Sequence, residues 1–239
     1  MPRGRREQIV QRLLADVIDG EFTAGEHLVT EDLARRYKVS HTPIREALST
    51  LAGIGVIDLR PHRGAVVRRL AARDLIDLIQ VRRVLECEAV RRACGRADPT
   101  QFTELAQELK KLAASKDSRG NRFVDQARLL DNRLHDLIAT ASGNALLAAE
   151  LNRLKLLFRA VRDAAWQVEG TPLRQRLLEE AGEHLAIVEA VLANDSKAAR
   201  VAMSKHIRAA VKYWLPIINS KTTSPPAPAR GKTSTRTTT

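Results

Sequence analysis

Aromatic residues are scarce in this chain, at 3% of its 239 residues. Proteins that bind single-stranded nucleic acid stack the bases on aromatic side chains, so this scarcity argues against such a surface. No apolar run approaches the ~18 to 20 residues that a membrane-spanning helix needs. The polar start MPRGRREQ also lacks the apolar segment of a signal peptide. We therefore expect a cytoplasmic protein without a membrane partner.

Cysteine is also rare, with only Cys87 and Cys94 in the chain. Both lie in one helical pattern, and seven residues of helix separate them by roughly 10 Å, which is too far for a disulfide between them. We interpret them as buried thiols rather than as redox or metal-binding groups.

Acidic residues are outnumbered, because 28 Asp and Glu face 40 Lys and Arg, for a formal net charge of +12. Such an excess favours a polyanionic partner, and the scarcity of aromatic residues makes duplex DNA the expected one. Hydrophobic residues make up 44% of the chain, which is enough to form one large or two modest domains with their own cores.

The first 70 residues show three helical patterns followed by two short strands. Ser40 is expected to cap the third helix, and Pro43 falls in its first turn, where a missing N–H costs little. After Gly55, residues 56–59 and 65–67 have the apolar, β-branched composition of strands around a turn. This order predicts a winged helix-turn-helix DNA-binding domain over residues 1–70.

The strand signal disappears after residue 70, and helical periodicity takes over. Short breaks with turn or capping residues separate six helical segments, roughly 73–96, 99–115, 122–141, 144–168, 172–193 and 196–214. We therefore predict a mainly α chain, in which the winged domain is followed by an all-α six-helix antiparallel bundle over residues 71–218. The polar, basic segment 219–239 is expected to be a disordered tail.

The third helix of the winged domain should enter the major groove of DNA. Its apolar positions face the domain core, which leaves its opposite face for the bases. Arg45 lies one turn into the helix, and its donor fork matches guanine O6 and N7, although a phosphate or solvent contact is the alternative. The residues predicted to face DNA, including phosphate contacts and the tip of the wing, are Arg35, Ser40, His41, Thr42, Arg45, His62, Arg63 and Gly64.

Three histidines and an aspartate of the predicted bundle have the spacing of a metal site. Asp131 and His135 are four residues apart and share one helix face. His184 lies about ten residues before the break at 194–195 and His206 about eleven after it, so an antiparallel hairpin brings both imidazoles to one height. We expect these four residues to bind a divalent metal, zinc first and nickel or manganese as alternatives. The other interpretation is a set of hydrogen-bonded core histidines.

The segments DGEFTAGEHL, LARRYKVSHTPIREAL and GVIDLRPHRGAVV, together with the helical C-terminal half, resemble GntR transcription regulators of the FadR subfamily. The resemblance covers residues ~5 to ~215. The family's usual SRTP reads SHTP here, so His41 replaces an arginine, whereas Arg45 matches.

This resemblance implies an FCD-type ligand-binding domain, in which D-x3-H on one helix and one histidine on each of the last two helices bind a metal that helps to hold a small carboxylate. Asp131, His135, His184 and His206 match that pattern. Arg82 matches the family's arginine for the effector carboxylate, whereas Arg83 is expected to face solvent. Asn144 is a second candidate for the effector, with helix capping as the alternative.

Taken together, these features favour a transcription regulator, a repressor rather than an activator. It would act as a homodimer on a palindromic operator and would respond to a small organic acid bound near the metal. One alternative is a metal-dependent enzyme fused to a DNA-binding module, but no further carboxylate is recognisably placed as a general base. The other alternative is a regulator whose metal is purely structural.

Overall fold

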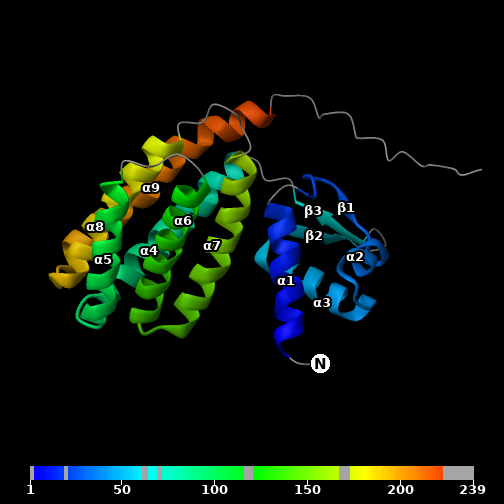
Figure 1. The fold of residues 1–239 in the computed structure, drawn as a ribbon, viewed down its shortest axis with the longest axis horizontal. Coiled ribbons are helices and arrows are strands. Elements are labelled where there is room, and N and C mark those ends of the chain that lie inside the picture. The colour runs from blue at the N-terminus through cyan, green and yellow to red at the C-terminus, as the bar shows by residue number, and fades with distance from the viewer. Residues whose placement is uncertain are drawn as a thin grey trace, which may run out of the picture.

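The computed structural model describes residues 3–18, 21–60, 64–68, 72–115, 121–166 and 173–222. Within these ranges the chain forms a small N-terminal half with a three-stranded sheet and a larger half made of helices only (Figure 1). The predicted mainly α architecture, a winged helix-turn-helix followed by a six-helix bundle, is confirmed. None of the described helices is both long and apolar enough to span a lipid bilayer.

In the described part of the N-terminal half, the body is formed by three helices, α1 (Arg3–Ile18), α2 (Thr30–Tyr37) and α3 (His41–Ile54). The residue before α3 is Ser40, as predicted, but its side chain makes no capping hydrogen bond. The α2 helix begins at Thr30, and Val29 occupies its N-cap position without a side-chain hydrogen bond. Gly55 ends α3 with a φ of 97°, a conformation that glycine adopts without steric cost.

The wing is the antiparallel hairpin of β2 (Ile57–Arg60) and β3 (Gly64–Val67), paired from Ile57↔Val67 to Arg60↔Gly64. A third strand, β1 (His27–Leu28), pairs with the other edge of β3 and gives the sheet order β1-β3-β2. Strand β1 was not predicted from the sequence, because two residues are too few to show the alternation of a strand.

Within its described residues, the C-terminal half forms six helices whose order matches the predicted segments. They are α4 (Ala72–Ala93), α5 (Pro99–Ala113), α6 (Asn121–Ala141), α7 (Ala145–Trp166), α8 (Leu173–Leu192) and α9 (Ser196–Thr222). The α9 helix continues past Pro216 to Thr222, beyond both the predicted helix end and the tail boundary at 218, so this proline does not end the helix. The rest of the predicted tail lies outside the described residues.

Helix α7 lies at the junction of the two halves, where it faces α1 (Figure 1). Arg153 of α7 donates from Nη1 to the backbone oxygen of Ile54, the last residue of α3, at 3.2 Å. The side chain of Leu157, one turn further along α7, lies 3.7 Å from the position that a Cβ on Gly55 would occupy. The C-terminal end of α3 therefore rests on the bundle.

Candidate metal centre and nucleic-acid interface

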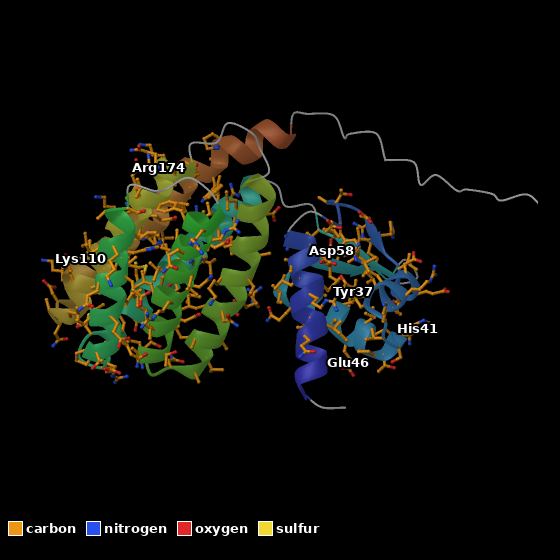
Figure 2. The ribbon with its side chains drawn as sticks, viewed as in Figure 1. Tyr37, His41, Glu46, Asp58, Lys110 and Arg174 are labelled. Carbon is orange, nitrogen blue, oxygen red and sulfur yellow. The ribbon has the colours of Figure 1, made fainter. Side chains whose placement is uncertain are left out.

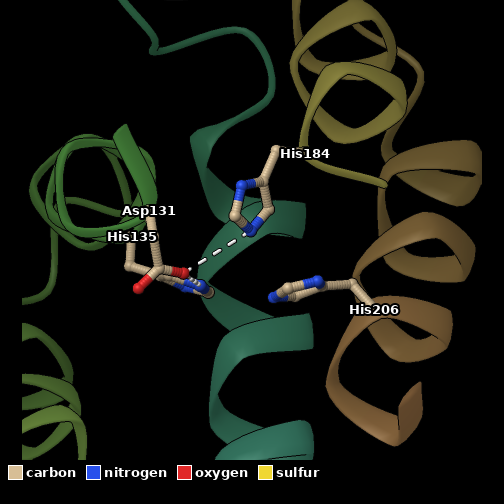
Figure 3. A group of neighbouring side chains, drawn as sticks. All are labelled: Asp131, His135, His184 and His206. Atoms are coloured by element: carbon tan, nitrogen blue, oxygen red, sulfur yellow. Dashed lines mark ion pairs between the residues drawn. The ribbon is translucent and has the colours of Figure 1, made fainter. Parts of the chain in front are cut away.

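Four side chains from three helices meet in the interior of the bundle (Figure 3). Asp131 and His135 come from α6, His184 from α8 and His206 from α9. One potential ligand atom from each lies within 4.8 Å of the others. All three imidazoles are buried, with exposed fractions of 3–4%. The four residues selected from spacing are thus brought together by the fold.

The hairpin between α8 and α9 brings the last two histidines to the same height. Asn194 takes the left-handed conformation, with a φ of 54°, and reverses the chain. Asp195 then caps α9, because its Oδ1 accepts hydrogen bonds from the backbone N–H groups of Lys197 and Ala198 at 3.0 and 2.9 Å. The centroids of the His184 and His206 rings end up 4.5 Å apart.

The distances between these groups fit ligands of one ion better than hydrogen-bonded partners. Asp131 Oδ1 lies 3.6 Å from His135 Nε2 and 3.5 Å from His184 Nε2. Both are too long for good hydrogen bonds, but two ligands of a tetrahedral zinc ion at ~2.0–2.2 Å are separated by about 3.4 Å. Within the described part of the chain, these two buried Nε2 atoms have no hydrogen-bond partner. The donor set of three imidazoles and one carboxylate therefore fits a divalent metal.

Two of the three histidines are backed by a carboxylate on the side away from the cluster, fully buried for Glu86 and partly buried for Glu183. His206 Nδ1 lies 2.8 Å from Glu183 Oε2, at hydrogen-bond distance. Arg176 in turn donates to both oxygens of Glu183, at 2.9 and 3.0 Å. When Nδ1 carries the proton that Glu183 accepts, the lone pair of His206 lies on Nε2. The carboxylate thus prepares His206 to bind a metal.

Glu86 of α4 plays the corresponding part for His135. Its Oε1 lies 3.1 Å from His135 Nδ1, an ion-pair distance, although the two groups are not aligned as a hydrogen bond. The same oxygen accepts from Arg82 Nη2 at 3.1 Å. Arg82 and Glu86 are both almost completely buried, at 4% and 1% exposure. This pair adds α4 to the helices that surround the cluster.

The pKa values of these groups follow from burial and from their partners. Burial raises the pKa of Glu86, but His135 and Arg82 outweigh it and hold the pKa at about 2. The pKa of Glu183 also lies at about 2, because His206 and Arg176 outweigh the effect of burial. Both carboxylates are therefore ionised at neutral pH and able to accept an imidazole N–H.

The pKa values of His135 and His184 are shifted in opposite directions. Burial lowers the pKa of His135, but the charges of Glu86 and Asp131 raise it to about 9. Burial, with His206 as the next cause, lowers the pKa of His184 well below its usual value. His184 is therefore a neutral imidazole, the form that binds metals.

The two residues considered for the effector have different positions. Arg82 lies beside the cluster, where its guanidinium bonds Glu86 and packs over the ring of Phe158, 4.7 Å from the ring centroid. Asn144 precedes α7, and its Oδ1 accepts a hydrogen bond from the backbone N–H of Leu147 at 3.1 Å. The structure thus shows the capping function of Asn144.

The predicted DNA-facing side of α3 is exposed. Ile44, Ala47 and Leu48 are buried, whereas His41 and Arg45 are open to solvent. His41 lies at the edge of the molecule that faces away from the bundle (Figure 2). His41 and Arg45 therefore lie on the exposed face of α3, as the side chains of a recognition helix must.

The remaining candidates for DNA contacts lie in α2, at the start of α3 and in the wing. Arg35 is exposed, and its charge is partly compensated by Asp32 at 3.2 Å and Glu31 at 3.5 Å. Ser40 and Thr42 are exposed at the start of α3, and Gly64 is exposed at the first position of β3. The wing-tip candidates His62 and Arg63 lie outside the described residues.

Of the residues behind the histidines, Arg82 was expected from the family resemblance alone, and Glu86, Arg176 and Glu183 were not predicted from the sequence. Arg82 and Glu86 are four residues apart, and Arg176 and Glu183 seven, spacings that put both partners on one face of a helix. Such pairs are common on solvated helices, so spacing alone gave no reason to single them out. Only the fold shows that these pairs are directed inward.

Comparison with known proteins agrees with this architecture. Residues 5–67 match the bacterial regulatory proteins of the gntR family, and residues 77–209 match the FCD domain. The chain is 31% identical to the Nta operon transcriptional regulator of Aminobacter aminovorans, over 84% of this chain and 90% of that protein. It is 27% identical to the HTH-type transcriptional repressor RspR of Escherichia coli K12, over 84% and 85% respectively.

A solved structure shares the fold of both halves. Escherichia coli McbR/YncC superposes with a TM-score of 0.72 at 21% identity, over 91% of this chain and 98% of that one. The matched families and relatives are transcription regulators, so they do not support the enzyme that the sequence analysis considered as an alternative. The chain belongs to the GntR family, with the FCD domain expected of its FadR subfamily, and is a DNA-binding transcription regulator.

Proposed function

We propose that this regulator binds a divalent metal through Asp131, His135, His184 and His206, and a small organic acid beside that metal. The observation that carries the proposal is the convergence of three buried imidazoles and the partly buried Asp131, with Nε2 atoms of His135 and His184 that face Asp131 without a hydrogen bond. A core that needed no ion would leave few such atoms unpaired.

Zinc is the leading ion, with nickel and manganese as alternatives. Imidazole suits zinc and nickel, whereas a carboxylate also suits manganese, and a mixed set accepts all three. When bound, the ion supplies a positive charge that attracts a carboxylate. The four protein groups hold it, and the carboxylates of Glu183 and Glu86 orient two of the imidazoles.

Arg82 is the proposed cation for the effector. Its Nη2 is engaged by Glu86, but its buried Nε has no hydrogen-bond partner among the described residues. A buried N–H without a partner costs free energy, and an effector carboxylate would relieve that cost. Asn144 remains a second candidate for the effector, in addition to its cap.

The proposed division of labour follows the two halves of the chain. Residues 1–70 bind DNA, residues 71–218 bind the metal and the effector and form the homodimer, and residues 219–239 are a basic tail. Two copies would place their α3 helices on the two halves of a palindromic operator. We propose that the protein is a repressor, as RspR is named to be, and that the effector releases it from DNA. We also propose that it acts in the cytoplasm, where bacterial DNA lies.

Metal analysis tests the centre. Protein purified without chelators should contain about one metal ion per chain by elemental analysis, whereas the double variant His184→Ala/His206→Ala should contain far less. His41→Ala is the control, because it removes an exposed histidine of the DNA-binding half and should keep the metal. Equal metal content in all three proteins would refute the site.

A DNA footprint titrated with a panel of small carboxylic acids tests the effector. At least one acid should release the DNA from the metal-loaded protein, and chelation should abolish that response. If the metal is purely structural, chelation should lower the melting temperature, and no acid should act in a metal-dependent way.

A further inference from the structure

Arg82 has contacts on two sides that join the candidate metal centre to another helix. On one side it donates to Glu86 Oε1, the oxygen that also lies 3.1 Å from His135 Nδ1. On the other side its guanidinium lies over the ring of Phe158 in α7, 4.7 Å from the ring centroid. Because Arg82 and Glu86 are buried, neither can change position without moving its partners.

Helix α7 carries this contact to the DNA-binding half. Leu157, next to Phe158 in the chain, packs near Gly55, at the end of α3. One turn earlier, Arg153 donates to the carbonyl oxygen of Ile54 at 3.2 Å. The helix that touches Arg82 at one face is thus hydrogen-bonded to the C-terminal end of the helix that is expected to read DNA.

We propose that Arg82 and Glu86 are positioning residues for His135, and that this pair couples metal occupancy to DNA binding through Phe158 and Arg153 of α7. The inference rests on the proposed metal centre. Metal binding fixes the ring of His135, which fixes Glu86 and then Arg82 against α7. A shift of α7 then changes the position of α3, because α7 contacts the C-terminal end of α3 through Arg153 and Leu157.

Coupling of this kind requires only that the metal-loaded and metal-free proteins differ in the packing around Arg82. Metal binding then changes the affinity for DNA by some factor. By reciprocity, DNA binding changes the affinity for the metal by the same factor. A chain of packed and hydrogen-bonded side chains is a physical route for such coupling, and cutting it should reduce the factor without weakening the metal site.

The experiment compares operator affinity with and without zinc. The probe is the duplex that the wild-type protein selects from a randomised library, and affinity is measured by fluorescence anisotropy for zinc-loaded and EDTA-treated protein. Phe158→Leu removes the ring face, and Arg153→Ala removes the bond to Ile54. Arg133→Ala is the matched control, because Arg133 is also a half-buried, ion-paired arginine, bonded to Glu104 and Glu108 of α5.

The wild-type affinities should differ by about fivefold or more between the two forms. In Phe158→Leu and Arg153→Ala this ratio should fall toward one by about twofold or more, with unchanged zinc affinity and a native circular dichroism spectrum. Arg133→Ala should keep the wild-type ratio. The proposal is overturned if the wild type binds zinc but has a ratio of one, or if both α7 variants keep its ratio.

A second measurement does not depend on zinc. In EDTA-treated protein, Glu86→Gln and Arg153→Ala are combined in a double-mutant cycle of operator affinity. A non-additive effect of about twofold or more supports the link, because the two residues share no direct contact. Additive effects overturn it. Failure of the protein to bind zinc would instead refute the metal centre, which keeps the two failures distinct.

Discussion

Replacing Glu183 by glutamine should weaken zinc binding without removing a ligand. In the structure the two oxygens of Glu183 bond both Nη atoms of Arg176, and Oε2 also lies 2.8 Å from His206 Nδ1. Glutamine has the same size, but one of its two terminal positions becomes an NH2 group that cannot accept a hydrogen bond. At least one of the three bonds is lost, and His206 loses its negatively charged partner and becomes a weaker base.

The magnitude follows from the general effect of such partners. Loss of the group behind a ligating histidine costs about 10- to 100-fold in metal affinity, or about 1.4–2.7 kcal/mol. With zinc far above its Kd, this loss reduces the stabilisation by zinc by the same amount. For a protein of this size 1 kcal/mol changes Tm by roughly 2–4 °C. The rise in Tm on adding zinc should therefore be about 3–11 °C smaller than in the wild type.

Zinc affinity is measured by competition with a fluorescent chelator, and Tm by thermal unfolding with zinc and with EDTA. The control is Glu180→Gln, because Glu180 pairs with the same arginine at 3.4 Å and its side chain is as buried as that of Glu183, at 15% and 16% exposure. The reasoning is refuted if Glu183→Gln binds zinc as the wild type does, or if Glu180→Gln loses as much affinity.

Four further predictions concern other parts of the molecule. Arg45→Ala should cost about 1–3 kcal/mol of operator affinity at one base position, measured on single-base operator variants, and unchanged base preference would exclude Arg45 as a base reader. Lys38→Gly should raise the free energy of unfolding in urea by about 0.5–1 kcal/mol, because Lys38 has a φ of 55°; a loss of stability would contradict this. Gly143→Ala should lower the free energy of unfolding by about 1–3 kcal/mol, because φ at this position is +66°; a neutral effect would contradict this. Burial raises the pKa of Cys87, so alkylation at pH 8 should be slower than that of glutathione, and an equal rate would contradict its burial.

Helical periodicity and capping residues predicted most of the fold, because each helix of the bundle carries its own apolar face and its own breaks. The hairpin of the wing was visible for the same reason, since Gly64 and the β-branched residues after it lie within one short segment. The strand β1 was not visible, because His27 and Leu28 become a strand only by pairing with Val66 and Ala65. Pairing partners almost 40 residues away leave no local pattern.

At the candidate metal centre, too, local sequence patterns predict some residues and not others. Asp131 and His135 lie on one helix face, and His184 and His206 flank one turn, so local geometry alone was enough to nominate all four. Local spacing cannot show whether a charged pair faces the interior or the solvent, because both orientations use the same periodicity.

The class of the molecule, the order of its helices and the four candidate metal ligands could be predicted from the amino-acid sequence, because they depend on short-range patterns. The positions of Glu86 and Glu183 behind two of those histidines, and the contact of Arg82 with α7, became visible only in the folded chain. These contacts join residues from different helices. Their existence depends on how the helices pack, and packing is a property of the whole chain.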